Sequence, residues 1–353
     1  MQKYINVLFI FVLLTADAHL RADVTIYGKM HVSLDYFSAD SPVPEQEISD
    51  IQVSSNASRV GFRGSGDLGG GLEALWQVES EVRVDEGARP SFAHRNSFLG
   101  LSGGWGTALA GKYDTPFKIV GRKLDLFGDT AADTRGITGI SPTGGPISER
   151  TPNTVAYISP DFSGFTAMVG YSADSEESNN PDRPDENEYY ALSVNGIYDQ
   201  GSLFVGGAFD SHSYPGDEVI TGWRVGGSYK LEDIGIKLGG QFESLQNSES
   251  EIGVTTFGLF GKYRFGKESV KIHYYNSTIS NGIDLGASHI ALGFGHRFNE
   301  NTQVYVQYVG VSNDDGSHPA GIGGPEHGDQ LDGQNPMAIS AGLVTGLGAE
   351  SWW

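Results

Sequence analysis

Apolar and polar residues alternate with a period of two along most of the chain. In the stretch 24–36 the even positions are mainly apolar and the odd positions mainly polar: Val24, Ile26, Gly28, Met30, Val32, Leu34 and Tyr36 against Thr25, Tyr27, Lys29, His31, Ser33 and Asp35. Successive side chains of a β-strand point to opposite sides. The alternation therefore predicts a strand with one apolar and one polar face.

The same alternation recurs in about sixteen segments along the chain. Their centres lie near residues 30, 61, 76, 98, 109, 156, 168, 193, 206, 226, 239, 260, 272, 293, 306 and 341. An even number of strands is typical of bacterial single-chain membrane barrels. The pattern predicts an all-β fold, a transmembrane antiparallel up-and-down β-barrel.

The connections between these segments alternate in length. Short turns such as Gly66–Gly69 and Asp199–Gly201 alternate with long polar stretches such as Asp174–Glu188, as in outer-membrane barrels. A soluble all-β protein would also show alternating strands. Aromatic residues at the ends of the apolar faces favour the membrane barrel, because they fit an interfacial girdle; they are Tyr36, Tyr171, Tyr198, Phe209, Tyr229 and Phe298.

The N-terminus has the pattern of a signal peptide. Lys3 precedes the apolar run Val7–Leu14, and small residues follow it, so that cleavage after Ala18 or after Ala22 fits. We expect a signal peptide over 1–22 and a barrel over 23–353. No later segment approaches the apolar length of a membrane helix, so a membrane protein of this sequence has to be a closed barrel.

Composition excludes several other classes of protein. The net charge is −21, with 23 Lys and Arg against 44 Asp and Glu, so we expect no nucleic-acid partner. The chain has no Cys, and its nine His are scattered, so we expect no metal site. Gly64–Gly69 matches G-x-G-x-x-G, but the segment after it has strand periodicity instead of the helix that a dinucleotide site needs. We expect no cofactor.

Several motifs carry a resemblance to a known family. They are Asp23–Gly28, Ser58–Gly64 with Asp67–Leu72, Arg95–Leu101 followed by Gly104–Gly106 and Gly111–Pro116, Leu124–Thr130, and Arg150–Tyr157. With these motifs the chain resembles the general porins of Gram-negative outer membranes. The resemblance implies a homotrimer of sixteen-stranded barrels in contact with outer-membrane lipid and lipopolysaccharide, each with a long third loop folded into its lumen. The C-terminus departs from the family. These porins usually end on an aromatic residue soon after a Gly-Leu pair, whereas here the chain continues from Leu343 to Trp353.

The connection from about 112 to 149 is far longer than an ordinary hairpin turn, and loops of that length are commonly functional. By parity Arg59 and Arg63 point into the lumen. The resemblance implies a basic wall at the constriction with Arg59, Arg95 and Arg150, to which parity adds Arg63. We expect this wall to face the third-loop carboxylates of Asp125, Asp129 and Asp133. Such a pair of surfaces predicts weak ion selectivity of either sign.

These features together predict an outer-membrane porin without enzymatic activity. Its water-filled channel would let small hydrophilic solutes and ions diffuse passively. A channel specific for anions or saccharides is the alternative within transport. A barrel adhesin or a barrel enzyme is the alternative from another class.

Overall fold

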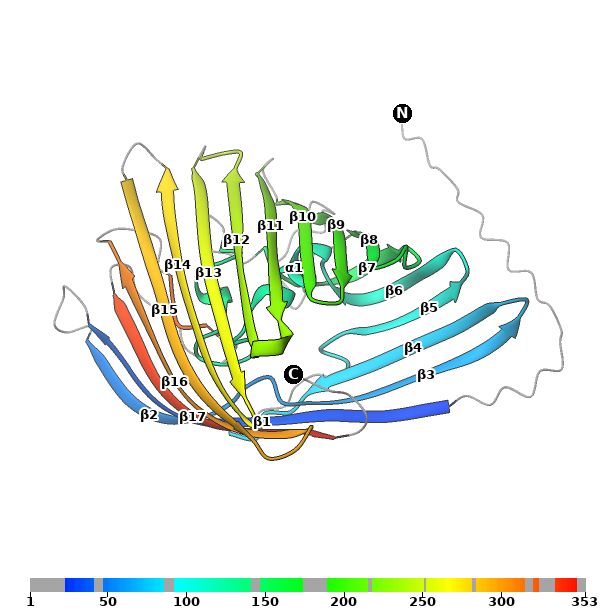
Figure 1. Cartoon of the computed structure of the whole chain (residues 1–353). Helices are drawn as coiled ribbons and strands as arrows, with labels where there is room; N and C mark the ends of the chain where they lie inside the picture. The colour runs from blue at the N-terminus through cyan, green and yellow to red at the C-terminus, as the bar shows by residue number, and fades with distance from the viewer. Residues whose placement is uncertain are drawn as a thin grey trace.

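The computed structural model describes residues 23–40, 47–85, 92–140, 147–173, 189–214, 218–250, 252–280, 284–314, 320–323 and 334–347. The expected signal peptide, the acidic stretch 174–188 and the last six residues, 348–353, lie outside these ranges. Within them most residues lie in β-strands, and the described helical elements are one short α-helix and two 3-10 turns (Figure 1).

Apart from the long first strand, the strands in the first half of the chain are mostly shorter than those in the second half. The bounds in the first half are β1 Asp23–Asp40, β2 Ile48–Ser55, β3 Arg59–Gly69, β4 Leu72–Glu81, β5 Ser97–Gly103, β6 Gly106–Asp114, β7 Arg150–Ile158 and β8 Phe165–Ser172. Those that follow are β9 Tyr190–Gln200, β10 Leu203–Ser213, β11 Val219–Leu231, β12 Ile236–Asn247, β13 Gly253–Phe265, β14 Glu268–Ser280, β15 Asp284–Arg297, β16 Thr302–Asn313 and β17 Asn335–Leu347.

Three helical elements complete the described fold. The α-helix α1 spans Pro116–Leu124, and the 3-10 turns η2 and η3 span Thr134–Gly136 and Glu232–Ile234. None of the helices in the described ranges has the length and apolar character to cross a membrane.

All strands pair antiparallel with their neighbours in one sheet, and the sheet closes because β1 also pairs with β17. The closing register runs from Gly28 opposite Leu347 to Asp40 opposite Asn335. β2 and β3 together form one strand of the wall, because β2 pairs with the second half of β1 and β3 with its first half. The wall therefore has sixteen strands, as the alternation predicts.

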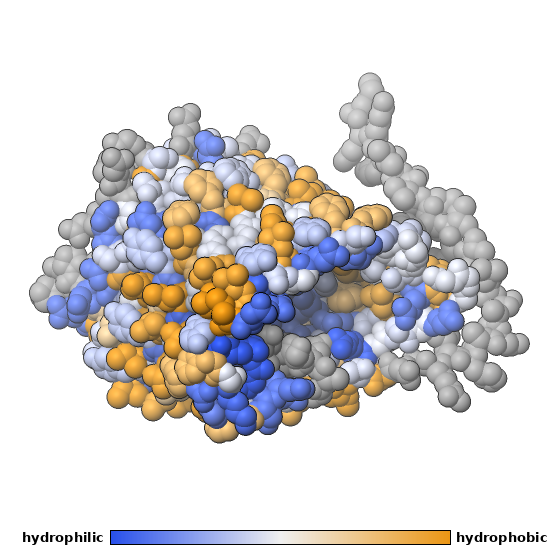
Figure 2. All heavy atoms as spheres, in the orientation of Figure 1, coloured by the Kyte–Doolittle hydropathy of each residue, from blue (hydrophilic) through white to orange (hydrophobic). Residues whose placement is uncertain are grey.

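The two faces of the wall differ as the sequence pattern predicts. On β1 the apolar side chains of Val24 and Ile26 are 56% and 63% exposed, whereas Lys29, His31 and Asp35 are buried on the opposite face. Hydrophobic residues cover much of the outer surface in Figure 2, and hydrophilic residues gather where it is hollowed. An apolar outside and a polar inside are typical of membrane barrels, whose outer face contacts lipid.

The outer face provides a test of the membrane setting. Leu259 lies at the middle of β13 and is 54% exposed. Leu259→Arg should lower the free energy of unfolding in lipid vesicles by about 2–4 kcal/mol, because it places a charge near the bilayer midplane. Urea titration of the folded barrel in vesicles measures this loss.

Ile234→Arg is the matched control, since Ile234 is equally exposed, at 56%, but lies in the η3 turn. Ile234→Arg should lower the free energy of unfolding by at most about 1 kcal/mol. Equal losses for both variants would contradict the assignment of β13 to the bilayer.

Candidate functional site

The long connection between β6 and β7 begins with α1. Thr115 caps this helix by accepting a hydrogen bond from the Lys118 amide at 3.2 Å, and Pro116 occupies the first turn. Both residues are favoured at helix N-termini. Phe117, Val120 and Leu124 form the buried apolar face of the helix.

This apolar face packs against the barrel wall at β9, β10 and β11. The contacting wall residues include Ile197, Phe204 and Ala208, which stand at positions that otherwise carry polar residues. Apolar residues on a polar face are therefore a signal in the sequence for a segment that docks there. Sequence reasoning by alternation alone missed it.

A buried ion pair fastens the connection to the same part of the wall. Arg224 on β11 pairs with Glu243 on β12, and both side chains are fully buried. Arg224 Nη1 also donates to the carbonyl of Phe117 at 3.2 Å, and the Gly139 amide donates to Glu243 Oε1 at 2.6 Å. Each end of the described stretch 115–140 is thus held by one member of the pair.

Asp129 lies at the centre of the charges of this connection. Its carboxylate is 2.7 Å from Lys29 Nζ, 3.4 Å from Arg59 Nη1 and 2.9 Å from Arg122 Nη2. Burial alone would raise the pKa of the Asp129 carboxyl, but the charges of Arg122, Lys29 and Arg59 lower this pKa well below its usual range. Asp129 also has φ of +60°, a conformation that few residues other than Gly adopt.

The other two carboxylates expected in the third loop bind partners within the connection itself. Asp133 pairs with Arg135 at 2.7 Å and with Arg122 at 3.2 Å. Asp125 accepts hydrogen bonds from the amides of Phe127 and Thr134. Burial and the neighbouring charge of Asp133 raise the pKa of Asp125 to about 7.

Two of the four expected wall arginines bind carboxylates of the wall. Arg95 Nε is 2.5 Å from Glu79 Oε1, and Arg150 Nη2 is 3.1 Å from Asp114 Oδ1. Each guanidinium thus has a carboxylate beside it, which compensates part of its charge. The alternation in the sequence gives no information about this pairing.

The remaining two arginines lie on β3, on the same face. Arg59 contacts Asp129 at 3.4 Å and Glu79 at 3.8 Å. The guanidinium of Arg63 lies 5.3 Å from the centre of the Tyr27 ring, in a cation–π contact. Of the seven expected residues, one arginine of the wall and one aspartate of the connection are therefore in contact.

Buried histidines form a further contact between the connection and the wall. The ring of Phe127 packs edge-on against His273 at 4.8 Å, and His273 Nε2 lies 2.8 Å from His289 Nδ1. His31 Nε2 lies 2.8 Å from the Tyr305 hydroxyl. These polar-face histidines are packed in the interior and do not face open solvent.

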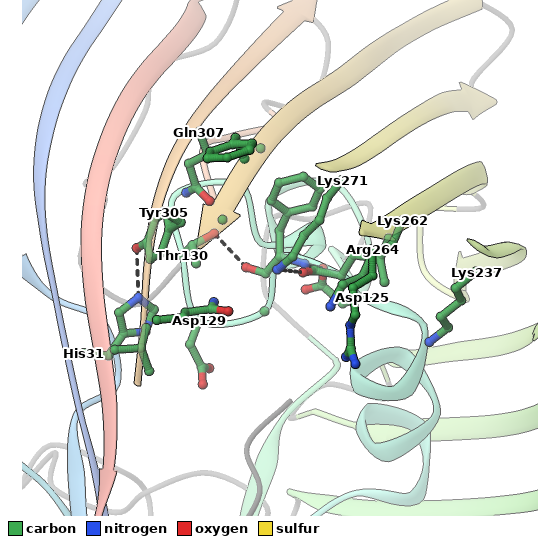
Figure 3. A pocket seen from close by; sticks show the side chains of 18 of the residues that line it. His31, Asp125, Asp129, Thr130, Lys237, Lys262, Arg264, Lys271, Tyr305 and Gln307 are labelled. Carbon is green, nitrogen blue, oxygen red and sulfur yellow. Dashed lines mark hydrogen bonds between the residues drawn. The ribbon is translucent and has the colours of Figure 1, made fainter. Parts of the chain in front are cut away.

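A cavity of about 820 Å³ lies between the connection and the wall (Figure 3). Eight cationic residues line it, namely Lys29, Arg59, Arg122, Lys230, Lys237, Lys262, Arg264 and Lys271. Three carboxylates line it as well, those of Asp125, Asp129 and Glu232. The cavity is therefore strongly basic, although the whole chain has a net charge of −21.

The lysines of β11–β14 were not among the site residues that the sequence predicts. Each stands at a polar-face position, so the alternation turns it inward. The available signal was that four consecutive strands carry a lysine within a few residues of a short turn. Only the register of the strands brings these lysines together.

The charge cluster around Asp129 can be tested with one isosteric change. Asp129→Asn leaves Lys29, Arg59 and Arg122 without their shared carboxylate, and loss of one partner of a buried ion pair costs about 3–5 kcal/mol. We expect a drop of that size in the free energy of unfolding, together with faster cleavage by trypsin after Arg122 in the folded barrel. Urea titration and limited proteolysis measure the two effects.

Asp199→Asn is the matched control, because Asp199 pairs with Lys123 at 3.0 Å and both side chains are exposed. Exposed pairs contribute at most about 1 kcal/mol. If Asp129→Asn were no more disruptive than this control, the cluster would not anchor the connection.

Most of the chain is similar to known proteins of one family. The family model described as Gram-negative porin matches residues 10–316. The major outer membrane protein P.IB of Neisseria lactamica is 25% identical over 311 residues, covering 81% of this chain and 87% of the relative. A P.IB protein of Neisseria meningitidis serogroup B is 29% identical over 308 residues, with 81% and 86% covered.

Solved structures agree with the fold. An anion-selective porin from Comamonas acidovorans superposes with a TM-score of 0.74 at 22% identity, covering 93% of this chain and all of the other. OmpF of Salmonella typhi superposes with a TM-score of 0.69 at 16% identity, covering 92% of this chain and 97% of OmpF. The trimer form of OmpT from Vibrio cholerae superposes with a TM-score of 0.65 at 16% identity, covering 92% of this chain and 99% of OmpT. Since the family model covers most of a chain that folds as a closed sixteen-stranded barrel, the chain belongs to the Gram-negative porin family and is a channel of the outer membrane.

Proposed function

We propose that this porin is a passive diffusion channel for small hydrophilic solutes that prefers anions, and that the β6–β7 connection folds into its lumen and narrows it. The observation that carries the proposal is the composition of the cavity wall, with eight cationic residues against three carboxylates. The preference is set by this local excess and not by the acidic total of the chain.

The contacts of the connection support the narrowing. Its helix contacts the polar faces of β9, β10 and β11, and Asp129 contacts Lys29 and Arg59 on β1 and β3. In a closed barrel the polar faces of the strands are turned to the interior. A segment that touches both sets of strands from that side crosses the lumen, and solutes would pass through the space that it leaves.

Electrostatics support the preference for anions. Charged side chains at a narrow passage with walls of low dielectric constant focus the field along that passage. Asp129 contacts four cations, so its charge is compensated locally. Arg59 and Asp129 would then form the narrowest part of the passage, while Arg63, Arg95, Arg150, Asp125 and Asp133 would support its two walls. The anion-selective porin of Comamonas acidovorans shares the fold.

A homotrimer accounts for the uneven height of the wall. β5 and β8 contain seven and eight residues, whereas β11–β17 contain twelve to fourteen. A strand needs roughly 9–11 residues to cross the hydrocarbon layer. We propose that the side of the barrel formed by these short strands is covered by the other two subunits of the trimer. Contact with lipopolysaccharide and the absence of enzymatic activity stay predictions from the sequence.

Because the chain has no Cys, a single engineered thiol can test this proposal. Leu126 is half-buried and lines the cavity. Modification of Leu126→Cys with charged methanethiosulfonate reagents should reduce the single-channel conductance, since it adds bulk at the narrow passage. The negatively charged reagent should react several times faster than the positively charged one, because the cavity concentrates anions.

Asn299→Cys provides the control, since Asn299 is exposed in the turn between β15 and β16. Its modification should leave the conductance unchanged. Unchanged conductance after modification of Leu126→Cys would exclude the narrowing. Faster reaction with the positive reagent would exclude the preference for anions.

A further inference from the structure

Four lysines form a row across the inner face of the barrel. In the strand register Lys230 of β11 lies opposite Lys237 of β12, Lys237 lies opposite Lys262 of β13, and Lys262 lies opposite Lys271 of β14. Residues directly opposite each other in antiparallel strands have their side chains on the same face. Adjacent strands are about 4.8 Å apart, so the row extends over roughly 14 Å.

No carboxylate among the described residues forms an ion pair with this lysine row. Lys271 Nζ donates to the carbonyl of Leu126 at 2.8 Å, and Lys237 Nζ lies 5.9 Å from the centre of the Phe260 ring. The contacts of the described residues give Lys230 and Lys262 no hydrogen-bond or ion-pair partner. Like charges directly opposite each other destabilise a sheet. The carboxylates of the described residues offset this cost only in part, since they act on the row through their charge without direct contact.

The row lines the cavity instead of the outer surface. All four lysines and Arg264 belong to its wall, and Figure 3 shows Lys237, Lys262, Arg264 and Lys271 around the same space. Asp125 lines the same cavity, but its oxygens accept hydrogen bonds from the amides of Phe127 and Thr134. The cations are thus available to a solute that enters the cavity.

We propose that the lysine row is a binding site for small solutes that carry two or more anionic oxygen groups, such as polycarboxylates and condensed phosphates. This inference rests on the proposed function, because the solute reaches the row through the channel. A polyvalent anion can contact two or three neighbouring lysines and loses the translational and rotational freedom of only one molecule. A monovalent anion has a single charged group and cannot pair with several lysines at once. Lysine acts as a point charge without the planar fork of arginine, so the site selects for charge number.

Block of the open channel tests the site. Single-channel currents would be recorded in 0.1 M KCl, where the Debye length is about 10 Å, with pyrophosphate, tricarballylate, orthophosphate or acetate added to one side. We expect pyrophosphate and tricarballylate to block at concentrations about tenfold or more below those of the other two. Block by only one of these two would support the site and assign its ligand to condensed phosphates or to polycarboxylates.

Variants of the row separate binding from a general effect of charge. Lys237→Gln with Lys262→Gln should raise the half-blocking concentration of the polyvalent anion by about tenfold. Lys237→Arg with Lys262→Arg should retain most of the block, because the charges remain. Lys123→Gln with Lys267→Gln removes two lysines that do not line the cavity and should leave the block unchanged.

The outcomes also distinguish this site from the proposed function. Block that survives in the Lys237→Gln, Lys262→Gln variant would overturn the site. Absence of block in a channel that still prefers anions would overturn the site and leave the proposed function standing. Absence of block in a channel that prefers cations would overturn both. Unitary current steps in every variant show that the barrel has folded.

Discussion

The pairing of β1 with β17 is the interaction on which the rest of the structure depends. It gives the first and last strands partners on both edges, so that the sheet has no open edge. In lipid an open edge would leave backbone amides and carbonyls without hydrogen bonds, each at a cost of several kcal/mol. Closure also separates the two faces of every strand. The apolar side chains then meet lipid, and the polar side chains enclose a space that charged residues can share.

The β6–β7 connection makes two kinds of contact with the polar faces of the wall. Its apolar helix face packs on Ile197 and Phe204, where the wall departs from its polar pattern. Its charged part joins Lys29 and Arg59 on the other side through Asp129. The first contact resembles a small hydrophobic core, and the second compensates buried charge. Both contacts depend on closure, because closure turns the polar faces of all the strands toward the same interior.

The two-residue period was enough to predict the wall. All sixteen centres of alternation lie within strands of the barrel. The division of the second wall strand into β2 and β3 was not predicted, because it depends on local geometry at Ala57, whose φ is +52°. No Gly or Pro marks this position in the sequence. The proposed signal peptide stays a prediction, since residues 1–22 lie outside the described ranges.

The site was predicted less completely than the wall, because pairing between side chains depends on register and on loop conformation. The family resemblance named Arg59 and Asp129, and the structure brings them within 3.4 Å of each other. The pairs Arg95 with Glu79 and Arg150 with Asp114 were not predicted. The lysine row appears only when four strands are aligned, because each of its members lies on a different strand. The basic cavity, and with it the sign of the ion preference that we propose, follows from that alignment.

The reversal potential of the unmodified porin in a planar bilayer tests the central claim most directly. Across a tenfold gradient of KCl at neutral pH, the potential should have the sign of a channel more permeable to chloride than to potassium. This result would follow from the excess of cations around the cavity. A potential of the opposite sign, or one close to zero, would contradict the account.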